Sequence, residues 1–177
     1  MAAEYPDEDL TEADEPESPS VNVFDIFKLL LQPLENVKQN PKWHPEGDAL
    51  YHSLQVFELA RQARPWDEEF LLAALLHDVG KAIDPYDHVD AGLEALEGMI
   101  TERTEFFIAY HMEAHALRSG TLGHRAGCRL AESEDYDELL LLSELDKAGR
   151  VCGARVCTID EALVFIRSVA NEAYLEE

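Results

Sequence analysis

Residues 70–81 read FLLAALLHDVGK, and this stretch decides the fold. Its first seven residues would be apolar on every side of a helix, which predicts a helix buried at the centre of the domain. Asp67 is suited to cap the N-terminus of that helix, and Gly80 to end it. The helix leads directly into His77 and Asp78, two polar side chains that packing alone does not require.

The chain on the N-terminal side of this stretch also has helical spacing. One helix is expected to begin at about residue 21, with Pro33 kinking or dividing it, and a second helix carries His52. A loop at residues 40–47, which holds two prolines and a glycine, separates these two helices. The short connection at residues 64–66 would allow the His52 helix to pack antiparallel to the central one.

Further helices are predicted on the C-terminal side. Their approximate ranges are 89–99, 102–117, 122–131, 136–149 and 158–174. Thr158 and Glu161 form the pattern of a capping box at the start of the last helix. No segment shows the period-two alternation of a half-buried strand, and no internal repeat is evident. The sequence therefore predicts an all-α fold.

The length of 177 residues and the composition favour a single compact domain. We expect it to form a helical bundle over residues 21–177. Residues 1–20 contain eight acidic residues, three prolines and no Lys or Arg, which predicts a disordered acidic tail. Without the charges of this tail, the formal net charge of −23 becomes about −15.

The acidic charge argues against nucleic acid as a partner, because phosphate binding needs clustered Lys and Arg. A small phosphorylated substrate is still possible, since a bound divalent cation reverses the field inside a cleft. No apolar run is long enough to span a membrane and no secretory signal is evident, so we expect a cytoplasmic protein. Three cysteines, Cys128, Cys152 and Cys157, predict buried free thiols and no disulfide framework. The oligomeric state is not indicated.

Four side chains of the predicted helices are suited to hold a divalent metal ion. His77 and Asp78 lie about 100° apart around a helix, so both reach one ion only near the helix end, where the backbone can bend. His52 would supply a second imidazole from the preceding helix. Asp146 follows the apolar stretch LLLLSEL, where an unpaired carboxylate is costly, and we expect it to complete the site.

This ordered set of residues resembles the HD-domain metal-dependent phosphohydrolase superfamily. The run LLHDVGK at residues 75–81 is the hallmark of that family, and the likeness covers about residues 44–150. The segment HPEGDALYHSL at residues 44–54 also resembles the HD portion of bacterial tRNA nucleotidyltransferases. The metal ligands that the resemblance implies are His52, His77, Asp78 and Asp146. It also implies that Lys81 lies near the substrate phosphate.

Further histidines leave open whether the site holds one ion or two. Some HD proteins add two histidines between the His-Asp pair and the final Asp, and His88 and His111 stand in that order here. His115 lies one helical turn after His111 and is a candidate for substrate binding. Alternatively, some of these histidines are surface groups or only orient a ligand. His44 and His124 are expected in loops or at helix starts, as polar groups outside the ligand set.

The sequence does not identify the metal. Imidazole and carboxylate ligands suit Mn, Fe, Co, Ni or Zn, and Mg remains possible. A bound ion would lower the pKa of a water molecule and polarise a phosphoryl oxygen, while Asp78 would bridge two ions or orient the nucleophile. Lys81 would neutralise charge that develops on the phosphate. Arg150, one turn after Asp146, either does the same or pairs with a carboxylate.

Three functions remain open from the sequence. The resemblance implies first a phosphomonoesterase or phosphodiesterase that hydrolyses a small, nucleotide-like substrate. The second is a di-iron oxygenase, which requires both His88 and His111 as ligands, although the short spacing from Asp78 to His88 counts against it. The third is a metal-binding regulatory module without turnover, although the chain keeps the full ordered ligand set. We expect no nucleotide addition, since that activity belongs to a separate polymerase domain.

Overall fold

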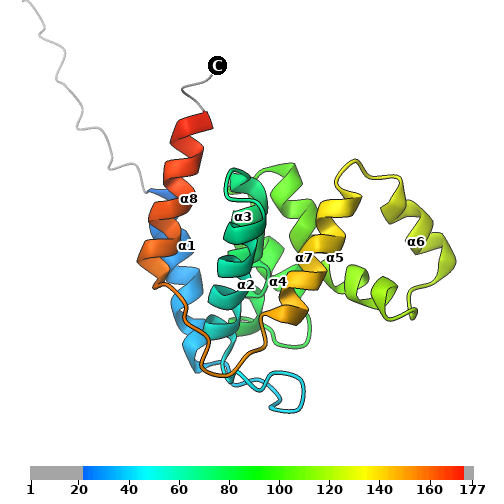
Figure 1. Cartoon of the computed structure of the whole chain (residues 1–177), viewed down its shortest axis with the longest axis horizontal. Helices are drawn as coiled ribbons and strands as arrows, with labels where there is room; N and C mark the ends of the chain where they lie inside the picture. The colour runs from blue at the N-terminus through cyan, green and yellow to red at the C-terminus, as the bar shows by residue number, and fades with distance from the viewer. Residues whose placement is uncertain (1–21, 174–177) are drawn as a thin grey trace, which may run out of the picture.

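The computed structural model describes residues 22–173, and the regular elements in that range are helices (Figure 1). The α-helices are α1 (Val23–Leu31), α2 (Ala49–Ala63), α3 (Glu68–Leu76), α4 (His88–Ala95), α5 (Glu102–Arg118), α6 (His124–Ala131), α7 (Tyr136–Ala148) and α8 (Ile159–Ala173). Two 3-10 helices are η1 (Gln32–Asn36) and η2 (Val79–Ala82). The all-α prediction is confirmed. The expected tail, and the predicted end of the last helix at Tyr174, lie outside the described residues.

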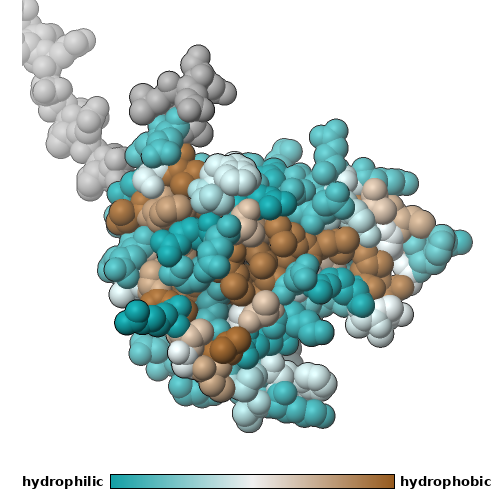
Figure 2. Space-filling view, in the orientation of Figure 1, coloured by the Kyte–Doolittle hydropathy of each residue, from teal (hydrophilic) through white to brown (hydrophobic). Residues whose placement is uncertain are grey.

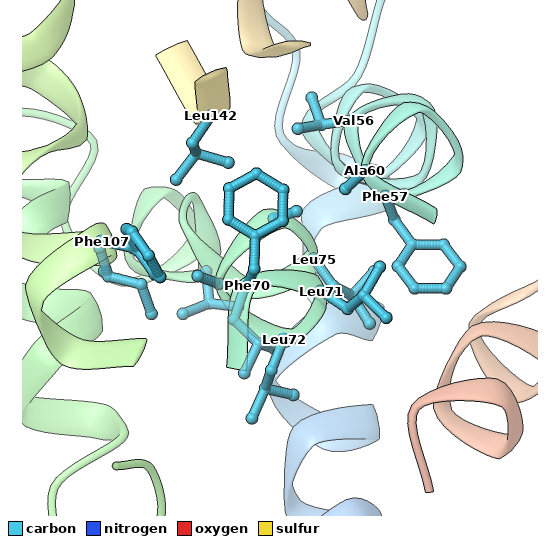
Figure 3. Packing of buried hydrophobic residues seen from close by; sticks show 14 of the residues in the cluster. Val56, Phe57, Ala60, Phe70, Leu71, Leu72, Leu75, Phe107 and Leu142 are labelled. Carbon is cyan, nitrogen blue, oxygen red and sulfur yellow. The ribbon is translucent and has the colours of Figure 1, made fainter. Parts of the chain in front are cut away.

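α3 is the central helix, as the sequence predicts. All seven residues from Phe70 to Leu76 are buried, and α3 packs against α2, α5, α7 and α8. Figure 3 shows apolar side chains of α3 facing Phe57 of α2, Phe107 of α5 and Leu142 of α7. Because the helix is enclosed from Phe70 to its end, the polar residues that follow its C-terminus also lie inside the domain.

The predicted start of α3 is confirmed, and its predicted end is wrong. The Asp67 side chain accepts a hydrogen bond from the backbone N–H of Phe70 at 3.1 Å, as an N-cap does. The helix ends at Leu76, and Gly80 lies beyond it within η2. A Cβ on Gly80 would lie 1.9 Å from the carbonyl oxygen of His88. Glycine is needed here because the start of α4 packs directly on its backbone.

Two other local predictions are confirmed. α1 ends at Leu31 and η1 follows, so the helix is divided just before Pro33. Thr158 and Glu161 form the expected capping box: the backbone N–H of Thr158 donates to Glu161 Oε2 at 2.8 Å, and that of Glu161 donates to Thr158 Oγ1 at 3.2 Å. Both features depend on neighbouring residues only.

The cysteines are free, as expected, but the prediction that they are buried is wrong. Cys128 and Cys152 are exposed because they lie on α6 and in the segment after α7, and Cys157 is half-buried. Burial raises the pKa of the Cys157 thiol to about 12, and the nearby Glu58 carboxylate adds to this effect.

The surface in Figure 2 is hydrophilic over much of its area, with apolar residues exposed across the middle of this face. None of the described helices has the length and apolar character that crossing a bilayer would require.

Candidate metal centre

The backbone bends at the His-Asp pair, as the sequence analysis expects. His77 keeps helical angles, with φ −53° and ψ −27°, and is the C-terminal cap of α3. Asp78 departs from the helix, with φ −108° and ψ 7°. The bend brings the two side chains together, so that His77 Nε2 lies 3.4 Å from Asp78 Oδ2.

A first group of ligand atoms comes from His52 on α2, His77 and Asp146 on α7. Their ligand atoms all lie within 4.8 Å of one another, and all three residues are buried. His52 Nε2 lies 3.1 Å from Asp146 Oδ1. Asp78 Oδ2 borders this group, at 3.9 Å from His52 Nε2. We name His52, His77 and Asp146 the first subsite.

A second group consists of Asp78, His88 at the start of α4 and His111 on α5, again within 4.8 Å of one another. Asp78 Oδ1 lies 3.6 Å from His88 Nε2 and 4.0 Å from His111 Nε2. We name these three residues the second subsite. The two oxygens of Asp78 thus face different subsites, which is the arrangement of a carboxylate that can bridge two ions.

The hydrogen bonds of the imidazoles direct one nitrogen of each ring into the centre. The Nδ1–H groups of His52, His77 and His111 donate to the carbonyl oxygens of Gly149 at 3.1 Å, Ala74 at 3.0 Å and Ile108 at 2.7 Å. Donation through Nδ1 leaves the Nε2 lone pair available to an ion.

The buried Nε2 atoms of His52 and His77 have no hydrogen-bond partner among the described residues. A buried polar atom without a partner is costly, and a divalent ion between these atoms and the carboxylates would satisfy them. The imidazole and carboxylate donors present fit such an ion and do not single out one metal.

The two carboxylates of the centre are held in the ionised form. Burial alone would raise the pKa of Asp78, but the neighbouring His77 ring and the Lys81 ammonium group hold it well below its usual range. Burial acts in the same way on Asp146, and the neighbouring His115 and His52 rings hold its pKa well below the usual range. Both groups are therefore ready to bind a cation at neutral pH.

The imidazoles of the two subsites differ in protonation. Burial lowers the pKa of His111 to about 4 and also lowers that of His88, so the second subsite has neutral rings at neutral pH. Burial would lower the pKa of His52 too, but the carboxylates of Asp146 and Glu46 raise it to about 9. Without metal, His52 therefore holds a proton that an ion must displace.

The predicted substrate residues lie beside the ligands. Lys81 Nζ donates to Asp78 Oδ2 at 2.6 Å and to Gln39 Oε1 at 2.8 Å. Arg150 Nη2 donates to Asp146 Oδ1 at 2.9 Å, so it pairs with a carboxylate, one of the two alternatives for this residue.

The remaining histidines lie outside both subsites. His115 bridges Ser143 and Asp146 by hydrogen bonds and belongs to neither subsite. His44 lies in the loop before α2, and the exposed His124 starts α6 next to Cys128.

Sequence reasoning missed Glu46, whose side chain is fully buried although it belongs to a loop. Its Oε1 lies 2.8 Å from His44 Nδ1 and 3.0 Å from His52 Nδ1. The loop composition predicts only an interruption of helix, and nothing in it indicates that this carboxylate folds back onto a ligand.

A pocket of about 700 Å³ opens onto the centre, with Asp78, His88, His111 and Asp146 in its wall. Four of the 14 Lys and Arg residues of the chain also line it: Lys81, Arg118, Lys147 and Arg150. Trp43 lies at the same pocket with 60% of its surface exposed. The pocket therefore gathers positive charge in a protein whose formal net charge is −23.

Comparison with protein families matches the HD domain to residues 49–150, a range that contains both subsites. The chain belongs to the HD domain family. This membership places it in a superfamily of metal-dependent hydrolases, as the sequence resemblance implies.

Curated relatives of this HD domain share the name Multifunctional CCA protein. The protein of Hahella chejuensis is 33% identical over 71% of this chain and 34% of its own length. The protein of an Acidovorax species is 30% identical over 79% of this chain and 39% of its own length. The protein of Halorhodospira halophila is 35% identical over 50% of this chain and 26% of its own length. The chain thus spans well under half the length of these relatives.

Proposed function

We propose that this HD domain is a metal-dependent phosphohydrolase that cleaves a phosphate ester or anhydride of a small, nucleotide-like substrate. The observation that carries the proposal is the position of Asp78. Its two oxygens face two groups of ligand atoms, and Asp146 of the first group and all three residues of the second line one pocket that also holds four cationic side chains.

A divalent ion bound at such a centre supplies Lewis acidity and a water of lowered pKa. The side chains around the ion have separate roles. Lys81 stands at the pocket wall, 2.6 Å from Asp78, where its ammonium group can neutralise charge that develops on a phosphoryl oxygen. His115 and Arg150 both contact Asp146 and hold that carboxylate in one orientation.

The pocket supports a small substrate rather than a polymer. Its volume of about 700 Å³ is in the range of small-molecule sites. The exposed indole of Trp43 offers a surface on which an aromatic base can stack, and Arg118 and Lys147 form no ion pair with another described residue. A nucleoside phosphate matches both features.

The proposal is tested by metal analysis together with phosphate release from nucleotides, phosphodiesters and sugar phosphates. We expect turnover that chelation abolishes and that one of the divalent metals restores. Asp78→Asn should lose metal from both subsites and reduce turnover by at least about 100-fold, as loss of a metal-bound group does. Asp90→Asn, at an exposed position of α4, is the matched control and should leave both quantities unchanged. Full metal occupancy without hydrolysis of any phosphate compound would contradict the proposal.

An HD-type di-iron oxygenase is the second candidate, and one observation favours it. That chemistry needs both His88 and His111 as ligands, and the two Nε2 atoms lie 3.3 Å apart beside Asp78 despite the short spacing in sequence. Oxygen consumption by the iron-loaded protein, with about two iron atoms per chain and no phosphate release, would support the oxygenase and exclude simple hydrolysis.

A further inference from the structure

Glu46 is a buried carboxylate that the proposed chemistry does not use. Its side chain is 0% exposed, and its Oε2 has no hydrogen-bond partner among the described residues. Its Oε1 contacts the Nδ1 atoms of His44 and His52 at 2.8 and 3.0 Å. The loop before α2 thus directs a full negative charge at the far side of a candidate metal ligand.

The charge of Glu46 needs compensation, because a buried carboxylate without a positive partner is costly. No Lys or Arg forms an ion pair with Glu46 within residues 22–173. Among the described residues, the side chains in contact with Glu46 are the two imidazoles, and His52 also faces Asp146 with its other nitrogen. A cation bound at Nε2 of His52 would therefore attract the Glu46 carboxylate electrostatically across the imidazole ring.

The two subsites differ in this respect. In the second subsite the Nδ1–H of His111 donates to a backbone carbonyl oxygen, and no carboxylate of the described residues contacts Nδ1 of His88 or His111. In the first subsite the Nδ1–H of His52 faces both the Gly149 carbonyl oxygen and Glu46. A carboxylate behind a ligating imidazole fixes its orientation and increases its basicity.

We propose that Glu46 is a positioning residue that orients His52 and makes the first subsite the tighter of the two metal sites. The inference rests on the proposed function only in that both subsites bind metal. It concerns metal affinity and not turnover, so it can fail while the hydrolase proposal stands, and the reverse also holds.

The test is a titration of the metal-free full chain with Co²⁺, without substrate, followed by calorimetry and by the visible absorbance of the bound ion. We expect two binding events in the wild type. Glu46→Gln, which removes the charge and keeps the size, should weaken the tighter event by about 10- to 100-fold and leave the weaker event unchanged. Glu46→Asp, which restores the charge, should recover part of the affinity.

Glu58→Gln is the matched control, because Glu58 is a largely buried carboxylate on the helix that carries His52 but contacts Arg61 and Cys157 instead. It should leave both events unchanged. Equal affinities in Glu46→Gln and Glu58→Gln would overturn the proposal. So would a third equivalent of Co²⁺ that His44→Ala removes, because Glu46 would then be a ligand of its own ion.

A measurement on the wild type tests the same proposal even if Glu46→Gln does not fold. In the protein loaded with diamagnetic Zn²⁺, the Nδ1–H proton of His52 should resonate further downfield than those of His77 and His111, whose acceptors are backbone carbonyl oxygens. A His52 signal at the same position as the other two would count against a carboxylate partner.

Discussion

Asp78 borders both subsites because it directly follows the C-terminal cap of a buried helix. Its φ of −108° departs from the helical value, and its side chain therefore lies between candidate ligands from α2, α4 and α5. With 2% of its surface exposed, the carboxylate is surrounded by imidazoles and by Lys81. A single carboxylate with two oxygens would then link the occupancy of one subsite to that of the other.

The raised pKa of His52 predicts a pH-dependent stability of the metal-free protein. The folded pKa of about 9 lies above the unfolded value of 6.5, so the proton on His52 stabilises the fold fully below pH 6.5 and less as the pH rises through 9. A pKa shift of this size corresponds to a contribution of about 3 kcal/mol to the free energy of unfolding. Urea unfolding with chelator present, measured at intervals from pH 6.5 to 9, should show this decline.

His52→Gln should flatten the pH dependence, whereas the exposed His124→Gln should keep it. His111 acts in the opposite direction, but its pKa of about 4 places its contribution below pH 6.5. A wild-type stability that does not change over this interval would show that His52 is not protonated in the metal-free fold.

At the scale of elements, the contact between Gly80 and the start of α4 sets the position of His88. A Cβ on Gly80 would meet the carbonyl oxygen of His88 at 1.9 Å and the backbone nitrogen of Gly92 at 2.5 Å. Backbone atoms cannot give way as a flexible side chain can. The distance between η2 and α4, and with it the geometry of the second subsite, depends on the absence of one methyl group.

Gly80→Ala should therefore lower the free energy of unfolding by about 2 to 3 kcal/mol and displace α4. We expect it to lose metal from the second subsite while the first subsite is retained. Urea unfolding and metal content measure the two effects. Gly123→Ala is the control, because a Cβ at Gly123 meets no atom within 4 Å and its φ is −63°. Two retained ions in Gly80→Ala would show that α4 adjusts without cost.

The elements show which features a sequence can predict. The buried α3, its Asp67 cap and the capping box at Thr158 follow from residues within a few positions of one another. Gly80 was assigned to the end of the helix because glycine often ends helices, whereas its actual role depends on α4, a contact that spacing does not reveal.

The candidate site also combines features that the sequence predicts with features that it does not. The ordered ligand types were predictable, because ligand chemistry restricts the residue types. The position of His115 against Asp146, and of Glu46 against His52, could not be predicted, since each contact joins segments that are far apart in sequence or in a loop without periodicity. The cysteines were expected to be buried from residue type alone, and two lie on exposed segments.

At the scale of the whole molecule, the net charge of −23 opposes the compact state by self-repulsion. Screening should reduce this effect. We expect the free energy of unfolding in urea to rise by about 1 kcal/mol, the size of exposed-charge effects, between low salt and physiological ionic strength. Tetramethylammonium chloride should act like sodium chloride at equal ionic strength. A stability that falls with both salts would mean that attractive ion pairs outweigh the repulsion.

The ligands of the two subsites come from α2, the end of α3, α4, α5 and α7, and no short segment of the chain carries a complete set. The unfolded chain therefore does not form the metal site, and a bound metal would favour the folded state by mass action. Proteases act on the unfolded fraction, which metal would keep small. The lifetime of each molecule would then follow the supply of its metal, so that starvation for that metal would reduce the amount of protein even at a constant rate of synthesis.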